Sequence, residues 1–469
     1  SADNRLESVE IAGGAIRDGM SVTLYQDPIA PYPYIWTAGS IDIAPGATLT
    51  IQPGIDLRSE YLSVVYVYGT LIADGTSEQP IRFLGGEYGG WLEFNSSSQN
   101  SLLDHVIIDG LGVPSSPNEQ QASVYIGTSS LTISNSIIRN SFSSGVRVYE
   151  AQPTIANTLI TDSVYYGLSL DYSYDANNAL YLSGSTIFNS GLHSIYTYLE
   201  NIRNFSADNR LESVEIAGGA IRDGMSVTLY QDPIAPYPYI WTAGSIDIAP
   251  GATLTIQPGI DLRSEYLSVV YVYGTLIADG TSEQPIRFLG GEYGGWLEFN
   301  SSSQNSLLDH VIIDGLGVPS SPNEQQASVY IGTSSLTISN SIIRNSFSSG
   351  VHIYGSGCPT ATIYNNDIMD SRYYGLYWGG NCEAFAENNW WGHASGPYHS
   401  TLNPSGQGDA IYGLVDFDPW LGAEQMPNLH VAPSALAFNE TIQAQNFVIT
   451  TTGSLPLNWT ISKNAPWLE

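Results

Sequence analysis

One long stretch of this chain is written twice: residues 1–146 recur letter for letter as residues 206–351. The identity covers the Val-Pro-Ser-Ser-Pro run at residues 113–117, which has the composition of an exposed loop, as well as the apolar stretches. A need for shared packing would preserve only buried positions, so a recent tandem duplication is the better explanation. Repetition on this scale is typical of a long, self-similar fold built from stacked units.

Short alternating runs dominate both copies. Residues 40–43 (Ser-Ile-Asp-Ile) and 48–51 (Thr-Leu-Thr-Ile) place an apolar side chain at every second position. Period two predicts strands that bury one face. The breaks between runs carry Gly, Pro, Asn and Asp, as in Ala-Pro-Gly at 44–46, and these residues form turns. With 47 glycines and only 13% charged residues, the composition also argues against a helical protein.

A finer period lies inside each copy. Residues 136–141 (Ser-Ile-Ile-Arg-Asn-Ser) precede Gly145, and residues 158–163 (Thr-Leu-Ile-Thr-Asp-Ser) precede Gly167, 22 residues later. The pattern returns at 185–190 and 366–371. About 22 residues hold three short strands and three corners, which is one turn of a parallel β-helix. Residues 1–421 would then form roughly 17 or 18 coils spanning about 80 Å, and we expect them to continue across residue 205.

Several motifs resemble bacterial secreted right-handed parallel β-helix proteins. They are residues 43–54, 67–76 and 79–83, whose second copy begins at Ile248, and near the end residues 388–392 (Asn-Asn-Trp-Trp-Gly) and 415–420 (Val-Asp-Phe-Asp-Pro-Trp). The resemblance covers nearly all of residues 30–421 and implies an all-β, right-handed parallel β-helix, or solenoid. That fold carries lyases, hydrolases, adhesins and passive surface proteins alike, so the resemblance implies no single activity.

The C-terminal residues differ in character. Residues 426–428 (Met-Pro-Asn) have the composition of a linker, and residues 431–469 resemble the start of a bacterial immunoglobulin-like module of the BACON type, through 457–461 and 465–468. About 40 residues are too few for an independent core. We therefore expect a short β-sandwich-like segment that is cut from a longer chain or completed by strand addition. The expected divisions are 1–205 (first β-helix copy), 206–421 (second copy and end of the helix), 422–430 (linker) and 431–469 (partial immunoglobulin-like segment).

Charge restricts the partners. The net charge is −31, and Lys463 is the only lysine among 14 basic residues, so nucleic acid would be repelled. No apolar run approaches the roughly 20 residues of a membrane helix, so we expect no membrane insertion. The chain opens on Ser1 without a charged and then apolar leader, which we interpret as a mature or trimmed secreted chain, extracellular or at the cell surface.

The two cysteines are expected to pair. Cys358 follows Gly350 by eight residues and Cys382 follows Gly375 by seven, so stacking of these glycines on successive coils would bring the sulfur atoms together. Two buried free thiols are the alternative. No Cys-x-x-Cys or Cys/His cluster of a zinc site is present.

Candidate catalytic groups are few. Glycan cleavage on a β-helix needs clustered carboxylates, and the sequence has no Asp-Asp or Glu-Glu dipeptide. Lys463 lies beyond the helix, which removes the usual lysine base, although an arginine could serve. Asp104, His105 and Asp109 fit an ordinary coil with polar residues outward, and His393 and His399 are expected to satisfy local hydrogen bonds. We predict no catalytic, cofactor-binding or metal site.

Two acidic groups could bind calcium weakly. Asp171 and Asp175 lie in a Tyr- and Asn-rich loop, and Asp409, Asp416 and Asp418 lie near the end of the helix. Neither group has a spaced ligand signature of the EF-hand kind. Solvated acidic corners are therefore the default interpretation.

Aromatic residues are the remaining binding signal. The chain has 31 tyrosines and 10 tryptophans, and residues 165–168 (Tyr-Tyr-Gly-Leu) are matched by 373–376. Such rings stack on sugars or pack against another rod, although alternation places about half of them inside. Our hypothesis is a non-catalytic extracellular structural protein, a rod or filament subunit that self-associates at the cell surface. The alternatives are an adhesin for extracellular glycans, a polysaccharide lyase or hydrolase, and, more remotely, an ice-binding surface around Thr48 and Thr50.

Overall fold

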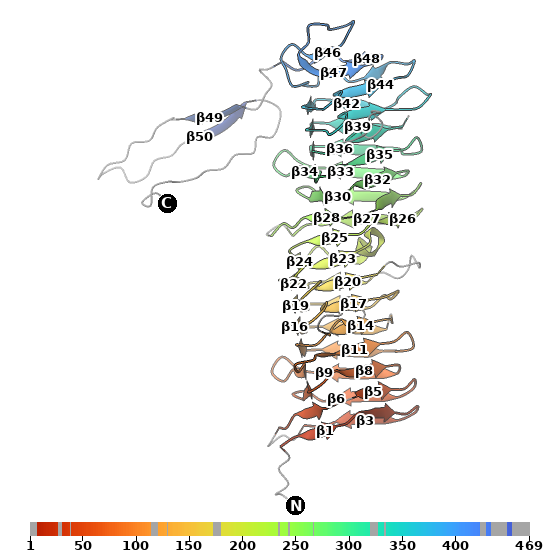
Figure 1. The fold of residues 1–469 in the computed structure, drawn as a ribbon, viewed down its shortest axis with the longest axis vertical. Helices are drawn as coiled ribbons and strands as arrows, with labels where there is room; N and C mark the ends of the chain where they lie inside the picture. The colour runs from red at the N-terminus through yellow and green to blue at the C-terminus, as the bar shows by residue number, and fades with distance from the viewer. Residues whose placement is uncertain are drawn as a thin grey trace, which may run out of the picture. The chain divides into compact units, whose positions relative to one another are not determined.

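The computed structural model confirms the parallel β-helix (Figure 1). It describes residues 7–26, 31–37, 39–113, 121–128, 130–171, 180–232, 235–242, 244–265, 267–318, 327–332, 334–422, 428–432 and 448–452. The chain divides into two compact units, Ser1–Ser268 and Val269–Glu469, and β32 (Ser268–Val272) spans the division. Among the described residues no helix is long and apolar enough to cross a membrane.

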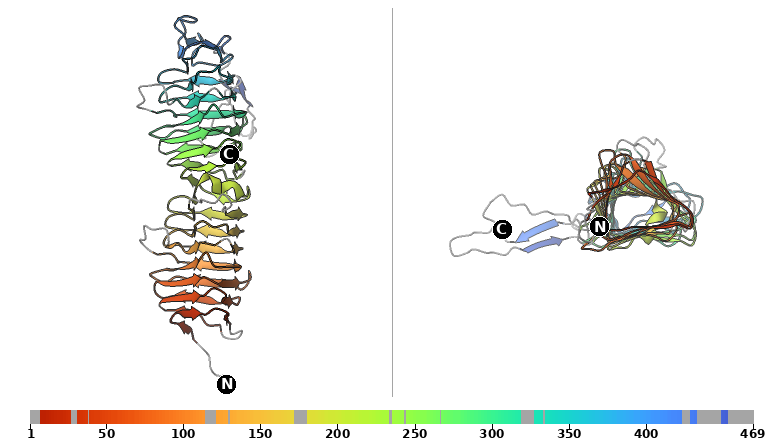
Figure 2. Two further views of the ribbon diagram at one scale, coloured as in Figure 1. Left: turned by 90° about the vertical axis from the view of Figure 1, so that its right-hand side faces the viewer. Right: turned by 90° about the horizontal axis from the view of Figure 1, so that it is seen from below.

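The first unit is a stack of three-sided coils, whose outline Figure 2 shows from the end. From β1 to β20 each strand pairs in parallel with the strand three places further along the chain, so each side of the coil builds one sheet. The first sheet consists of β1 (Val9–Ile11), β4 (Tyr34–Trp36), β7 (Asp56–Ser59), β10 (Ile81–Leu84), β13 (Val106–Asp109), β16 (Ile137–Arg139), β19 (Leu159–Thr161), β22 (Thr186–Phe188) and β24 (Arg210–Leu211).

The second and third sheets complete each coil of this unit. Within this unit the second contains β2 (Gly14–Ile16), β5 (Gly39–Ile43), β8 (Ser63–Val67), β11 (Gly90–Phe94), β14 (Val124–Ile126), β17 (Val146–Val148), β20 (Leu168–Leu170), β23 (Ile195–Thr197), β25 (Val214–Ile216), β28 (Tyr239–Trp241) and β31 (Asp261–Ser264). The third consists of β3 (Ser21–Leu24), β6 (Thr48–Ile51), β9 (Thr70–Asp74), β12 (Ser101–Asp104), β15 (Leu131–Ser134), β18 (Thr154–Ala156) and β21 (Tyr181–Ser183).

Alternation within these strands decides which side chains form the core. In β6, Leu49 and Ile51 are buried while Thr48 and Thr50 are partly exposed. Successive coils then align the inward residues into columns, because parallel pairing puts equivalent positions opposite one another. One inward column of the second sheet is Ile41, Val65, Leu92, Val124, Val146, Leu168, Ile195, Val214, Tyr239 and Leu262.

This column passes through the point where the second copy begins. Ile195 of β23 pairs with Val214 of β25, and the two strands lie on opposite sides of residue 206. A 3-10 helix, η2 (Leu199–Asn204), lies between these strands in sequence. The stack therefore continues across the duplication junction inside the first unit.

After the junction the repeated sequence starts in a different sheet of the coil from the one in which it started in the first copy. β25 has the same sequence as β1, yet β1 belongs to the first sheet and β25 to the second. The repeat therefore does not contain a whole number of three-sided coils. After the junction β26 (Gly219–Ile221) pairs with β29 (Ser245–Ile248), and β27 (Ser226–Leu229) pairs with β30 (Thr253–Ile256).

An Asn or Asp recurs at one position of the finer period because the backbone there is left-handed. Asn140, Asp162 and Asn189 occupy equivalent corners, with φ of 52°, 57° and 54°. Left-handed backbone is strained for most residues, but Asn and Asp tolerate it because their short polar side chains bond locally. Each corner turns the chain from one sheet to the next.

The second unit has the same coil plan. Its strands are β33 (Thr275–Asp279), β34 (Ile286–Leu289), β35 (Gly295–Phe299), β36 (Ser306–Asp309), β37 (Val311–Asp314), β38 (Val329–Ile331), β39 (Leu336–Ser339), β40 (Ile342–Arg344), β41 (Val351–Ile353), β42 (Thr362–Tyr364), β43 (Asp367–Met369), β44 (Leu376–Trp378), β45 (Ala384–Phe385), β46 (Pro397–Tyr398), β47 (Gly408–Tyr412) and β48 (Val415–Asp416). In the Asn-Asn-Trp-Trp motif near the end of these coils, Trp391 is fully buried.

The C-terminal segment contributes one described strand pair. β49 (Asn428–Ala432) and β50 (Val448–Thr452) are antiparallel. β49 begins inside the stretch 422–430 that we expected to be a linker. Residues 433–447 and 453–469, which carry most of the resemblance to an immunoglobulin-like module, lie outside the described residues.

Candidate functional site

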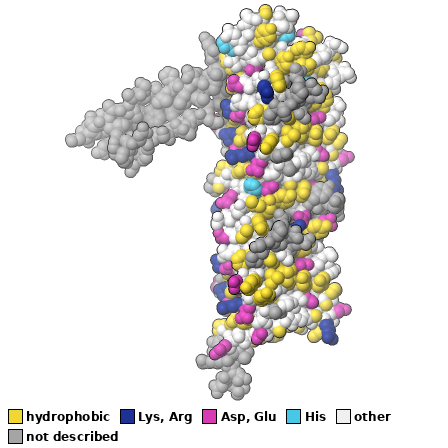
Figure 3. Space-filling model, viewed as in Figure 1, with side chains coloured by type: hydrophobic (Ala, Val, Ile, Leu, Met, Phe, Trp, Pro, Cys, Tyr) yellow, Lys and Arg dark blue, Asp and Glu magenta, His cyan; other side chains and the backbone are white. Residues whose placement is uncertain are grey.

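The outward positions of the coils carry charged side chains among apolar ones, as Figure 3 shows for one face. Asp104 lies beside His105, with 2.6 Å between Oδ2 and Nδ1. Burial opposes ionisation of Asp104, but hydrogen bonds from Ser134, His105 and Asn135 outweigh it and lower the pKa of this carboxyl group. Asp104 is therefore held as an ionised acceptor, which does not suit a general acid.

Asp109, the second acid near His105, makes hydrogen bonds of its own. Asp109 accepts hydrogen bonds from Arg139 and Asn140 of the next coil, at 2.8 and 2.7 Å. Asp104 and Asp109 thus each bond to the coil that follows, as Asp309 and Asp314 do in the second copy. The structure gives these acids partners in neighbouring coils, a pattern that fits stacking better than catalysis.

Two of the acids considered for calcium, Asp171 and Asp409, make local contacts. Asp171 pairs with Arg147 at 2.8 Å, and burial raises the pKa of Asp171 in spite of this partner. Asp409 accepts the Ser371 N–H at 2.8 Å, and burial raises its pKa too. The described residues hold no group of three or more metal-ligating side chains, and Asp175 lies outside them.

The remaining named candidates make local bonds. His393 Nδ1 lies 2.8 Å from Ser395 Oγ, and His399 Nδ1 accepts the Leu402 N–H at 3.0 Å. The structure joins Cys358 to Cys382 in a disulfide with Cα atoms 5.2 Å apart. The glycines behind this pairing do stack, since a Cβ on Gly350 would lie 2.9 Å from the Gly375 carbonyl oxygen.

Aromatic side chains line up on one sheet of the second unit. Strands β38, β41, β44 and β47 align the outward residues Tyr330, His352, Tyr377 and Tyr412, which we call the aromatic column. Ring centroids lie 4.9 Å apart for Tyr330 and His352, and 4.7 Å apart for each of the next two pairs. The Tyr377 and Tyr412 rings are parallel to within 4°.

A second ring and an acid extend this array. Tyr354 stacks on Tyr330 with centroids 4.1 Å apart, and its hydroxyl group approaches Glu298. Burial, helped by the Glu298 charge, raises the pKa of Tyr330 and of Tyr354. Both hydroxyl groups are therefore protonated at neutral pH, and that of Tyr354 donates its proton to the Glu298 carboxylate. Flat rings beside polar hydroxyl and carboxylate groups can stack on a sugar and hydrogen-bond its edge.

The first copy lacks this array because the two copies diverge there. The register of the second sheet places Tyr125, Arg147, Ser169 and Tyr196 in the corresponding column. The first position at which the copies differ is Arg147 against His352. The repeated Tyr-Tyr-Gly-Leu can be recognised in the sequence, but the column was not predicted from it. Its signal is a central ring residue in three-residue strands such as Val-Tyr-Ile.

Comparison with known proteins agrees with the fold. A family model described as "Right handed beta helix region" matches residues 256–391. Over this stretch the chain is similar to that family, and the parallel coils extend on both sides of the matched residues. No match was found among curated proteins or among solved structures.

Asp367 of β43 is a buried acid whose pKa is strongly raised. It is 3% exposed, and its Oδ1 has no hydrogen-bond partner within the described part of the chain. Loss of solvent on burial raises its pKa from 3.8 to about 7. The folded state therefore favours the protonated form, and this residue costs stability wherever the unfolded chain would ionise.

The sign of that effect gives a prediction for Asp367→Asn. Because the folded pKa is above the unfolded one, the stability of the native protein falls as pH rises from about 4 to 7 and then levels off. We expect Asp367→Asn to raise the free energy of unfolding at pH 8 by up to about 4 kcal/mol, with the gain shrinking toward pH 4. Urea denaturation at both pH values measures this, with the exposed Asp74→Asn as control. A loss of stability at pH 8 would contradict the assignment.

Proposed function

We propose that this chain is a non-catalytic structural protein, secreted to the cell surface, whose duplicated β-helix serves as a scaffold or as a filament subunit. The observation that carries the proposal is the unbroken pairing of Ile195 with Val214 across the duplication junction. A duplication that adds coils to an existing stack extends a scaffold and needs no new chemistry. This is the gain expected when length itself is the useful property.

The outward acids support the same role. Asp104 bonds to Ser134, the last residue of β15, and to Asn135 at the corner after it, both in the coil that follows. Asp109 does the same with Arg139 and Asn140. These bonds repeat once per copy and link adjacent coils, so they contribute to stacking. An acid used in glycan cleavage would instead point toward substrate with a second carboxyl group near it.

Two measurements on the purified chain test the structural role. In negative-stain electron microscopy we expect elongated particles that form longer assemblies, either alone or with a surface partner. In incubations with acidic glycans we expect neither unsaturated products absorbing in the ultraviolet nor new reducing ends. Short dispersed particles at every concentration and with every partner would contradict assembly, and product formation would favour a lyase or hydrolase.

Carbohydrate binding is the second candidate, and the aromatic column favours it. Tyr377 and Tyr412 present parallel rings on adjacent strands, and Tyr412 is 48% exposed. The rings repeat at the strand spacing of the sheet and stack on one another, so the column presents a repeated row of ring edges and polar atoms to an extended glycan. An adhesin would bind without turnover.

We expect Tyr412→Ala to weaken retention on a glycan array. Losing one stacked ring should cost about 1 kcal/mol, or about fivefold in affinity. Tyr181→Ala, which removes a tyrosine of similar exposure from β21 in the first unit, is the matched control and should leave retention unchanged. Equal losses in the two variants, or no retention by the unaltered chain, would remove this candidate.

A further inference from the structure

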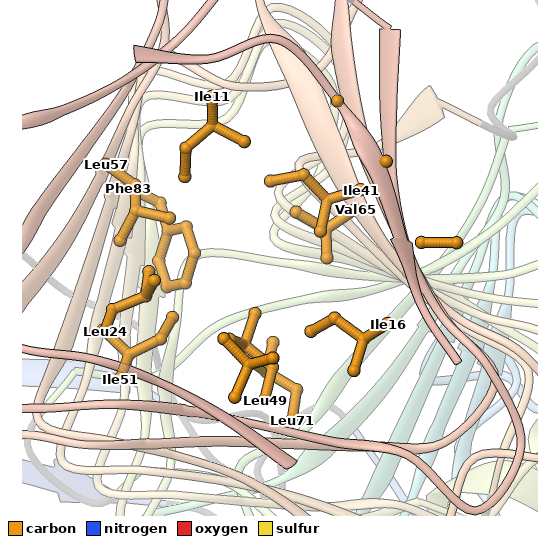
Figure 4. A pocket seen from close by; sticks show the side chains of 14 residues that line it. Ile11, Ile16, Leu24, Ile41, Leu49, Ile51, Leu57, Val65, Leu71 and Phe83 are labelled. Carbon is orange, nitrogen blue, oxygen red and sulfur yellow. The ribbon is translucent and has the colours of Figure 1, made fainter. Parts of the chain in front are cut away.

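The outer face of the third sheet has an uncharged central column. Leu49 and Ile51 of β6 and Leu71 of β9 point into the interior, where they line an apolar cavity of about 240 Å³ (Figure 4). The residues between them along each strand therefore point outward. The central outward column is Thr50, Ile72, Leu102, Thr132, Thr154 and Tyr181, and each member is at least partly exposed.

The outward columns of the other two sheets of this unit carry charges. Asp56 is paired with Arg82 on the first sheet, and Asp42 and Glu93 lie in one column of the second. On strands β6 to β21 of the third sheet, charged residues occupy only the last positions of β9 and β12, at the margin of the sheet. The third sheet therefore offers a face on which charge is confined to one edge.

The second unit has the same uncharged column. Its members, on β33, β36, β39, β42 and β45, are Ile277, Leu307, Thr337, Thr362 and Phe385. The last two lie beyond the stretch that is identical in the two copies. Thr362 stands where the first unit has Thr154, and Phe385, 51% exposed, stands where it has Tyr181, 49% exposed. The column has thus stayed uncharged, with an exposed ring at its end, where the two copies differ.

Threonines beside the columns widen each of them into a strip. Thr48 pairs with Thr70 next to the first column, and Thr275 lies next to the second. The Thr70 hydroxyl donates to the Gln99 carbonyl at 2.8 Å, and the Thr275 hydroxyl donates to the Gln304 carbonyl at 3.0 Å. Covering the face would not leave these two donors unpaired. We call the two columns, together with these threonines, the uncharged strips.

The charge of the chain decides which surfaces two copies can bring together. The net charge is −31, so copies repel one another at long range. Contact through a charged face would bring like charges together or bury them unpaired, and both cost free energy. The uncharged strips avoid these costs. Each strip also presents outward residues at one constant strand spacing, so it can pack against an identical strip related by a two-fold axis.

The area of the strips matches what a stable pair of chains needs. The strips lie on six strands of the third sheet and on five strands in the second unit. Strands about 4.8 Å apart and about 13 Å long give the two strips about 700 Å² on one chain. Burial of the same area on a partner brings the total to about 1,400 Å², within the usual size of specific protein interfaces. The strip of the first copy alone would reach only about half of this area, so the duplication strengthens the contact.

We infer that the uncharged strips form a side-by-side interface with a second copy of this chain. Each strip packs against a strip of the partner, and the acids at the ends of β9 and β12 lie in the polar rim of the contact. The exposed rings of Tyr181 and Phe385 supply the largest apolar side chains of the two columns. The inference names the contact for the self-association in the proposed function, and in that respect rests on it.

Sedimentation velocity of the full chain over a range of concentrations tests this interface. We expect a monomer–dimer equilibrium whose dissociation constant falls at least about threefold between about 0.05 M and about 0.5 M sodium chloride, because salt screens the repulsion between acidic chains. Thr132→Asp should raise the dissociation constant at least about tenfold, since each dimer would then bury two unpaired carboxylates. Thr186→Asp, which adds the same charge to the outer face of the first sheet, is the matched control and should change the constant less than about twofold.

A second variant covers the case in which Thr132→Asp fails to fold. Thr132→Val keeps the shape of the side chain and adds no charge. It should associate at least as tightly as the unaltered chain, because the contact buries apolar surface.

Several results would overturn the inference: a monomer at every concentration and salt, equal weakening by the two Asp variants, or weaker association at high salt or in Thr132→Val. A freezing point that the monomer depresses and Thr132→Asp restores would assign the strips to ice instead. Longer assemblies in electron microscopy that persist in Thr132→Asp would keep the filament role and remove this interface. A dimer that Thr132→Asp abolishes, without longer assemblies, would keep the interface and remove the filament role.

Discussion

Stacking of inward apolar side chains between successive coils is the interaction on which the rest of the structure depends. Each strand buries alternate residues and also fixes the position of its neighbour through parallel backbone pairing, so one register serves both the core and the sheets. At about 25 cal/mol for each Å² of apolar surface buried, a column such as Leu92, Val124 and Val146 gains stability with every coil added. The fold therefore tolerates duplication, because a new copy continues the columns.

The same register organises the surface. Outward residues on adjacent coils lie one strand spacing apart. Charged side chains at such positions therefore form ion pairs and hydrogen bonds between coils, and tyrosines at such positions stack their rings. Asp109 with Arg139 is one outcome, and Tyr377 with Tyr412 is the other. Which outcome occurs depends on a few outward residues, as the divergence between Arg147 and His352 illustrates. Function on this scaffold is thus decided by side chains that the core does not constrain.

Local patterns predicted the fold because they are tied to the core. Alternation identified Leu49 and Ile51 as buried, and the 22-residue spacing stacked Gly145 against Gly167, where the Val146 N–H bonds to the Gly167 carbonyl. The rotation at the junction was not predictable, since it depends on the number of strand positions in a whole copy and on η2, which carries no clear helical signal. The aromatic column was missed because Tyr330, His352, Tyr377 and Tyr412 are separated by loops of unequal length, so their alignment requires the register.

A pair of engineered cysteines tests most directly whether the coils continue in register across the duplication junction. Thr186 of β22 and Arg210 of β24 are directly paired and both point outward. Parallel neighbours lie about 4.8 Å apart, within the Cα separation that a disulfide spans. Mild oxidation of a chain carrying Thr186→Cys and Arg210→Cys should give an intramolecular disulfide in nearly every molecule, whereas Phe188→Cys with Arg210→Cys, two residues out of register, should not. Failure of the first pair to close, or equal closure of both pairs, would contradict the account.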